Sequence, residues 1–180
     1  MKVNVVNEGL KWGSINGLIA VLLMYGSWAA GLNTFVSVQF WSNFIPFMIA
    51  ILIITGLQIR KQNDGILPFS QALKFTFLSY VVVALITAIA TYVLYNLIDK
   101  ELTQKSVQVG LEKTRAMMEK FGASEEDIDK AVKSGMEEGA KGTGLGKIFM
   151  GTRLFLIWDF VKSLLISLVI RKEEKFADNQ

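Results

Sequence analysis

The longest stretch without charge constrains this chain more than any other feature of its sequence. Between Lys11 and Arg60 there are 48 consecutive residues and no Asp, Glu, Lys or Arg among them. About 20 residues are enough for one helix to cross a bilayer, so this stretch is long enough for two crossings. Another uncharged run, of 24 residues, lies between Lys74 and Asp99. Such runs predict an integral membrane protein.

Four transmembrane helices account for the apolar stretches. Hydrophobic residues make up 52% of the chain, more than a single water-soluble core of this size needs. The fold class that we predict is therefore all-α, an integral membrane four-helix bundle. A polar link over 33–39 is predicted to turn between the first two spans. The spans are predicted at about 12–32, 40–59, 75–98 and 148–170.

The segment 99–147 differs in composition from the rest of the chain. It contains ten acidic and nine basic residues, so it is predicted to lie in water. Apolar residues spaced by three or four predict two amphipathic helices there, which would form a helical hairpin. Ser124 and Asp127 are typical of a capping box at the start of the second helix, and Gly139 is a candidate stop. The predicted parts are spans one to three in 1–98, the hairpin in 99–147, and span four with a tail in 148–180.

Lysine and arginine residues near the spans predict the orientation. They gather before span one, between spans two and three, and after span four, which is one side of a four-span protein. Because positively charged loops tend to stay in the cytoplasm, both termini are predicted cytoplasmic and the hairpin extracytoplasmic. A rival interpretation makes the first span a secretory signal cleaved near Ala29, which would leave three spans. The basic residues are Lys2, Lys11, Arg60, Lys61, Lys74, Arg171, Lys172 and Lys175.

Small residues recur along the first span. Gly9, Gly13 and Gly17 follow each other at intervals of four, and Gly26 with Ala30 continues the pattern. In lipid, where packing drives helix association, small residues at this spacing let another helix approach closely. We interpret the stripe as a contact within the four-helix bundle, and a homo-oligomer face is the alternative.

Two opposite charges fall in the middle of the fourth span. Asp159 and Lys162 are three residues apart, so they share a helix face and are predicted to form an ion pair. A charge at the centre of a span costs about 3 kcal/mol and is often functional. Two interpretations stay open: a self-neutralised pair that faces the bundle interior, and a polar site on an ion or proton path.

The residue types that are missing limit the chemistry. The chain has no cysteine and no histidine, which removes thiolate nucleophiles, histidine bases and the usual zinc ligands. We predict no catalytic site, no metal site and no cofactor. The net charge of +3 comes without a basic run, so nucleic acid is not an expected partner.

A further set of residues surrounds the loop after span two and the end of span three. Its members are Gly56, Arg60, Gly65, Phe69, Ala72 and Asp99. This set resembles the pattern of the DUF4199 family, small multi-span membrane proteins of Bacteroidetes, and the resemblance covers most of the chain. It implies the multi-span architecture and a bacterial inner membrane. It implies no activity, because none is assigned to the family.

Taken together, the sequence predicts a non-enzymatic inner-membrane protein with a structural or interaction role. Its surroundings are the lipid bilayer, and the 99–147 hairpin is the expected contact surface for a membrane or periplasmic protein. The alternative is a small transport or ion- or proton-conducting subunit that uses Asp159 and Lys162. The two differ in polar lining, because a conducting path needs several polar groups aligned at membrane depth.

Overall fold

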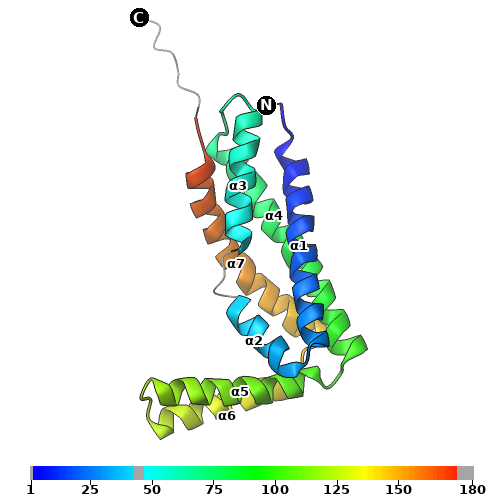
Figure 1. Cartoon of the computed structure of the whole chain (residues 1–180), viewed down its shortest axis with the longest axis vertical. Helices are drawn as coiled ribbons and strands as arrows, with labels where there is room; N and C mark the ends of the chain where they lie inside the picture. Colours follow the sequence, from blue (N-terminus) through cyan, green and yellow to red (C-terminus); the bar gives the residue numbers. More distant parts are fainter. Residues whose placement is uncertain (1, 43–46, 174–180) are drawn as a thin grey trace, which may run out of the picture. The chain divides into compact units, whose positions relative to one another are not determined.

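The computed structural model describes residues 2–42 and 47–173, and nearly all of this part of the chain is helical (Figure 1). The all-α prediction is therefore confirmed. Among the described residues the only β-type pairing is a single antiparallel bridge between Leu67 and Lys172. The elements are α1 (Val5–Ala29), α2 (Leu32–Ser42), α3 (Phe47–Gln62), α4 (Phe69–Val93), the π-helical turn η1 (Leu94–Ile98), α5 (Leu102–Lys120), α6 (Glu125–Ala140) and α7 (Leu145–Ile170).

The chain forms two compact units, each assembled from segments that are distant in the sequence. The first unit contains most of α1, α4 and α7 together with α3. The second unit contains α2, η1, α5 and α6, with the end of α1, the end of α4 and the start of α7. Their bounds are Met1–Val21, Ile45–Thr87 and Gly151–Gln180 for the first unit, and Leu22–Phe44 and Ala88–Met150 for the second.

Each unit has its own apolar core. In the first unit, α1, α3, α4 and α7 all contribute buried side chains, among them Val5, Leu52, Phe75 and Ile170. In the second unit the buried cluster consists of Met24, Phe35, Leu94 and Leu102. Contacts between residues distant in sequence therefore fix both units.

The outer surface of the first unit is unusually apolar, while its interior contains polar groups. Large side chains on α1, α4 and α7 are exposed, including those of Leu18, Leu85 and Trp158. The buried polar residues of this unit are Asn16, Thr55, Asn63, Thr76, Ser79, Asp159, Ser163 and Ser167. Soluble proteins normally show the opposite preference.

The turn predicted over 33–39 is wrong, because these residues lie within α2. The turn is made instead by Gly31, whose φ of +112° lies in the left-handed region that favours glycine. Within α2, Ser37 Oγ donates to Asn33 O at 2.7 Å, so the helix itself satisfies this polar side chain. Phe35 is buried on the same helix. Polar composition therefore did not mark a loop here.

By length and apolarity, one described helix can cross a membrane. This is the continuous segment Phe69–Ile98, 30 residues long, formed by α4 and η1. α2 and α3 qualify as a second crossing only when they are counted together as one broken span. The span predicted at 40–59 is thus divided between two helices. α7 is long, but Arg153, Asp159 and Lys162 interrupt its apolar sequence.

The two helices predicted in 99–147 are α5 and α6, which lie side by side (Figure 1). As predicted, Ser124 caps α6, since its Oγ accepts a hydrogen bond from Asp127 N at 3.2 Å. The stop predicted at Gly139 is wrong, because α6 continues to Ala140. Gly139 is buried instead, and a Cβ there would lie 2.7 Å from Val107 Cγ1. This glycine serves the packing of α6 on α5.

Candidate functional site

An ion pair within the first unit lies in the second half of α7, where the surrounding helix sequence is apolar. Lys162 Nζ lies 2.6 Å from Asp159 Oδ1. The spacing of three residues brings both side chains to one face of the helix. The Asp159 side chain is largely buried, whereas that of Lys162 is 39% exposed. The pair therefore lies at the border of the bundle interior.

Tyr80 of α4 is the third member of this site. The ammonium of Lys162 lies 5.1 Å from the centroid of the Tyr80 ring, within the range of a cation–π contact. Tyr80 is buried, and its hydroxyl has no hydrogen-bond partner among the described residues. Sequence reasoning missed Tyr80, because the contact depends on the packing of α4 against α7 and no local pattern reports it.

Hydroxyl groups close to this site hold α4 to α7. Thr76 Oγ1 lies 3.0 Å from Ser167 Oγ and donates to Ser163 O at 3.3 Å. Ser163 and Ser167 themselves donate to carbonyls one turn earlier in α7, at 2.7 Å and 2.6 Å. Each of these hydroxyls is thus engaged with helix backbone or with another hydroxyl. Such bonds are typical of helix packing.

The glycines of α1 face α4. A Cβ on Gly13 would lie 2.7 Å from Val82 Cβ and 2.8 Å from Ser79 O, so the two helices approach more closely than a side chain allows. Gly9 and Gly17 meet α4 in the same way, one on each side of Gly13. Ser79 Oγ also donates to Gly9 O, at 3.2 Å. These three positions form a close contact within the first unit.

Gly26 and Ala30 do not continue this contact. Both residues are exposed, and a Cβ on Gly26 would meet no atom within 4 Å. The close contact of α1 with α4 is therefore confined to the first three glycines of the stripe. The homo-oligomer interpretation of the stripe stays a prediction.

Gly56 and Arg60 lie where the end of α3 meets the end of α7. A Cβ on Gly56 would lie 2.5 Å from Ile170 Cδ1, so glycine permits a close approach of the two helices. Arg60 Nη1 donates to Ile170 O at 3.3 Å and to Arg171 O at 3.5 Å. The last carbonyls of a helix lack partners within it, and a cation is favourable beside them. Arg60 therefore caps α7 from a neighbouring helix.

The loop after α3 holds the segment that follows α7. Leu67 and Lys172 exchange two backbone hydrogen bonds, both of 2.9 Å. Phe69 N donates to Glu173 Oε1 at 3.0 Å, at the start of α4. Gly65 has a φ of +81°, which allows the chain to turn between α3 and this pairing.

Asn63 ties the start of the chain to the same loop. Its Oδ1 accepts from the backbone N–H groups of Lys2 and Val3, at 2.8 Å and 2.9 Å. Lys2 Nζ also lies 2.9 Å from Asp64 Oδ1. Sequence reasoning did not find Asn63, because its partners Lys2 and Val3 are 61 and 60 residues away in the sequence. We call the contacts of Lys2, Arg60, Asn63, Gly65, Leu67 and Lys172 the helix-end junction.

Ala72 and Asp99 are the two remaining members of the residue set named in the sequence analysis. Ala72 is buried in the core of the first unit. Asp99 belongs to the second unit, where its Oδ2 accepts from Trp28 Nε1 at 3.2 Å and its Oδ1 lies 3.8 Å from Lys105 Nζ. Across residues 2–42 and 47–173, no group of three carboxylates is placed to hold a metal ion. The described contacts of the set join one helix to another.

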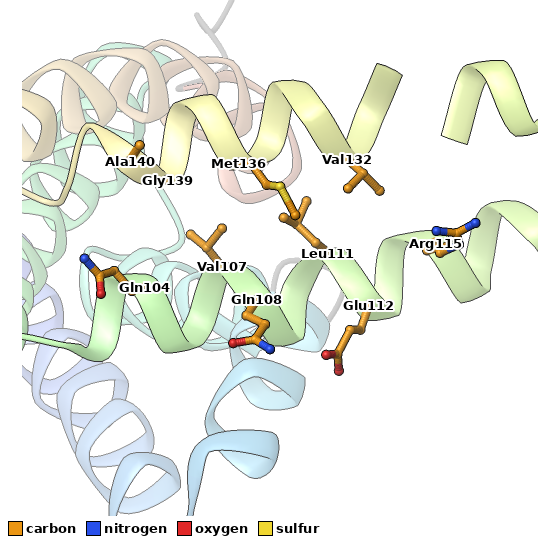
Figure 2. Close-up of a pocket in the computed structure, with 10 residues that line it drawn as sticks. All are labelled: Gln104, Val107, Gln108, Leu111, Glu112, Arg115, Val132, Met136, Gly139 and Ala140. Atoms are coloured by element: carbon orange, nitrogen blue, oxygen red, sulfur yellow. The ribbon is translucent and has the colours of Figure 1, made fainter. Parts of the chain in front are cut away.

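A groove of about 570 Å³ runs along the hairpin beside the α5–α6 contact (Figure 2). Val107 and Leu111 point from α5 toward α6, and Met136 points back toward α5 (Figure 2). Gln108 and Glu112 point away from α6 (Figure 2). The groove thus combines an apolar floor with polar groups at its edge, which is the usual chemistry of a protein-binding surface.

The fold and these contacts define an all-helical protein with a membrane-crossing candidate in α4 and η1, whose singled-out residues join helices. The model of a family described as "Protein of unknown function (DUF4199)" matches residues 11–172. The chain therefore belongs to the DUF4199 family, which confirms the resemblance. No curated protein and no solved structure matches the chain.

Proposed function

We propose that this protein is an integral, four-span protein of the bacterial inner membrane with a structural or interaction role and no enzymatic activity. The observation that carries the proposal is the reversed distribution of side chains in the first unit. Leu18 is 58% exposed and Trp158 is 67% exposed, whereas Ser163 and Ser167 are fully buried. Exposed apolar area costs about 25 cal/mol per Å² in water, but it is favourable against lipid.

Helix lengths support four crossings. α1 has 25 residues and α7 has 26, and each exceeds the roughly 20 residues that a crossing requires. The contact between Asp159 and Lys162 neutralises two charges within α7, which lowers the cost of placing that helix in lipid. α4 with η1 supplies another crossing, and α2 with α3 supplies the fourth.

The helix-end junction supports the proposed orientation. It brings together the start of α1, the loop after α3 and the end of α7, which are the segments that contain the basic clusters. Lys2, Arg60 and Lys172 all take part in its contacts. A cytoplasmic location of this junction satisfies the preference of positive residues for the cytoplasm. Both termini are then cytoplasmic, and the hairpin, which follows the other end of α4, is extracytoplasmic.

The interaction role is assigned to the hairpin. Its groove between α5 and α6 offers an apolar floor to a membrane or periplasmic protein, or to a second copy of this chain. A photo-crosslinking residue at Met136, which lines the groove, should then yield a discrete protein adduct in cells. The same residue at Lys133, an exposed position that does not line the groove, serves as the control. If the two positions gave the same adducts in equal yield, the groove would not be the contact surface and the proposed interaction role would be wrong.

Reporter fusions test the membrane proposal. We expect a fluorescent protein fused after Gln180 to be active, and alkaline phosphatase inserted at Ser134 to be active, since these reporters work inside and outside the cytoplasm respectively. Alkaline phosphatase inserted at Asp64, in the loop after α3, should be inactive. An active phosphatase at Asp64, or a chain that sodium carbonate releases from membranes, would disprove the proposal.

A small transport or ion-conducting subunit is the second candidate. It is favoured by the buried Tyr80 hydroxyl, which has no partner among the described residues and belongs to a residue that contacts Lys162. Against it, the hydroxyls of Thr76, Ser163 and Ser167 are used in helix contacts. Thr87 also donates to Val83 O within its own helix, at 2.8 Å. A row of free polar groups, which conduction needs, is therefore not formed by these residues.

A further inference from the structure

α5 has two apolar faces, and α6 covers only one of them. Val107 and Leu111 contact Gly139 and Gly135 of α6. Met117, on the other face, is 42% exposed, and Phe121, which directly follows α5, is 81% exposed. Two hydrophobic side chains of this size at the end of a hairpin in water are unfavourable, so their exposure indicates a binding surface.

A second groove, of about 490 Å³, lies between this face of α5 and α2. α2 contributes Val36, Phe40 and Trp41 to the groove. On the other side lie Met117 of α5 and Phe121, the first residue after α5. Among the described residues that line the groove, the charged ones are Lys113 and Lys120, and none is acidic. The groove is therefore apolar on its floor and positive at its edge.

This combination fits an amphiphile with an apolar tail and an anionic head. Helices that lie in the surface of a bilayer have lysines beside aromatic and aliphatic residues, and long lysine side chains can keep their ammonium at the level of the headgroups. Tryptophan is also favoured at this level. Lys120 forms no ion pair with a described residue, so its ammonium is available to a phosphate, whereas Lys113 Nζ donates to Ser37 Oγ.

We propose that the groove between α2 and α5 binds anionic phospholipid on the extracytoplasmic side of the membrane, with Met117 and Phe121 against the acyl chains and Lys120 at the phosphate. The proposal rests on the membrane location proposed above and extends it to the hairpin. α2 supports this choice of occupant. Together with α3 it is long and apolar enough for one broken span, and in the proposed four-span arrangement it forms the extracytoplasmic end of that span.

The absence of cysteine from the sequence makes a clean test available. Single variants Met117→Cys and Phe121→Cys of the full chain are labelled with a nitroxide and reconstituted in vesicles that contain phosphatidylglycerol. Collisions with oxygen, which concentrates in lipid, are compared with collisions with a water-soluble nickel complex. We expect oxygen to dominate at both positions and nickel to dominate at Lys133→Cys on α6.

A label at Leu85→Cys, on the exposed side of α4, separates the two proposals. If the Leu85 label collides mainly with nickel, the membrane location itself is wrong. If that label is in lipid while the labels at 117 and 121 behave like the one at 133, only the lipid groove is overturned. If the labels at 117 and 121 are protected from both reagents, protein covers the groove, and this also overturns the proposal.

The headgroup is tested with Lys120→Gln. In the chain with Lys120, the oxygen preference of the label at 117 should be greater in phosphatidylglycerol vesicles than in phosphatidylcholine vesicles. Lys120→Gln should abolish this difference, and Lys133→Gln should preserve it. An equal oxygen preference in both lipids before any lysine is replaced would show that the groove does not recognise an anionic headgroup.

Discussion

Replacing Gly13 with alanine should separate α1 from α4. The added Cβ would lie 2.7 Å from Val82 Cβ, 2.8 Å from Ser79 O and 3.0 Å from Ser79 Cα. Two of these three atoms belong to the backbone of α4, so rotation of a side chain cannot relieve the overlap. α1 must therefore move away, and the hydrogen bond from Ser79 Oγ to Gly9 O, now 3.2 Å long, is weakened.

The expected magnitude follows from three contributions. Overpacking of a close contact costs about 1–3 kcal/mol. Loss of the bond between Ser79 and Gly9 adds about 1 kcal/mol. Alanine is favoured over glycine within a helix by about 1 kcal/mol, which offsets the hydrogen bond. We therefore expect Gly13→Ala to lower the free energy of unfolding by about 1–3 kcal/mol.

Gly26→Ala is the matched control. It lies on the same helix, but a Cβ there meets no atom within 4 Å, so it gains helix preference without a clash. Its free energy of unfolding should be unchanged or higher by up to about 1 kcal/mol. Both variants are unfolded by dodecyl sulfate titration from one mild detergent and followed by circular dichroism. Equal stability of the two variants would refute the close approach of α1 and α4.

Three further predictions concern charged groups. Asp159→Asn leaves Lys162 without its partner and should lower the free energy of unfolding by about 1–3 kcal/mol, less than for a fully buried pair because Lys162 is 39% exposed. The double variant Asp159→Leu with Lys162→Met should be close to the parent in the same titration, and a folded double variant that fails to complement a deletion strain would support the conducting subunit. Arg60→Gln uncaps α7 and should cost about 1 kcal/mol, with faster hydrogen exchange at residues 170–172; unchanged exchange there would contradict the capping role. The ammonium of Lys141 lowers the pKa of Glu138, so this contact stabilises the end of α6 above the usual glutamate pKa and is lost as pH falls below about 4. Hydrogen exchange at the end of α6, corrected for intrinsic rates, should rise across that range in the parent but not in Glu138→Gln.

Local patterns in the sequence predicted the elements that local interactions stabilise. The period of the apolar residues located α5 and α6, and the cap at Ser124 fixed the start of α6. At the start of the chain the helix extends beyond the predicted span, since α1 begins at Val5 whereas the span is predicted from about residue 12. The charged residues before Trp12 do not interrupt the helix, because Glu8 lies 3.6 Å from Lys11 and accepts from Trp12 Nε1 at 3.0 Å. Charges that pair within a helix do not end it.

Contacts between distant segments were not predictable in the same way. The contact of Asp159 with Lys162 follows from a spacing of three residues on one helix. Tyr80 joins the same site only because α4 packs against α7. Arg60 reaches Ile170 only because α3 also packs against α7. No periodicity within a single helix indicates which other helix it packs against, so one sequence by itself cannot predict these contacts.

The helix-end junction gives a physical meaning to much of the residue set that resembles the DUF4199 family. Gly56 permits the approach of α3 to α7, Arg60 caps α7, and Gly65 permits the turn that leads to the Leu67–Lys172 pairing. Each of these roles closes one end of the first unit. A set that closes a bundle determines architecture, so it need not report activity. The interaction role proposed above needs an exposed surface, and the two grooves that α5 lines, one with α6 and one with α2, are the first places to test.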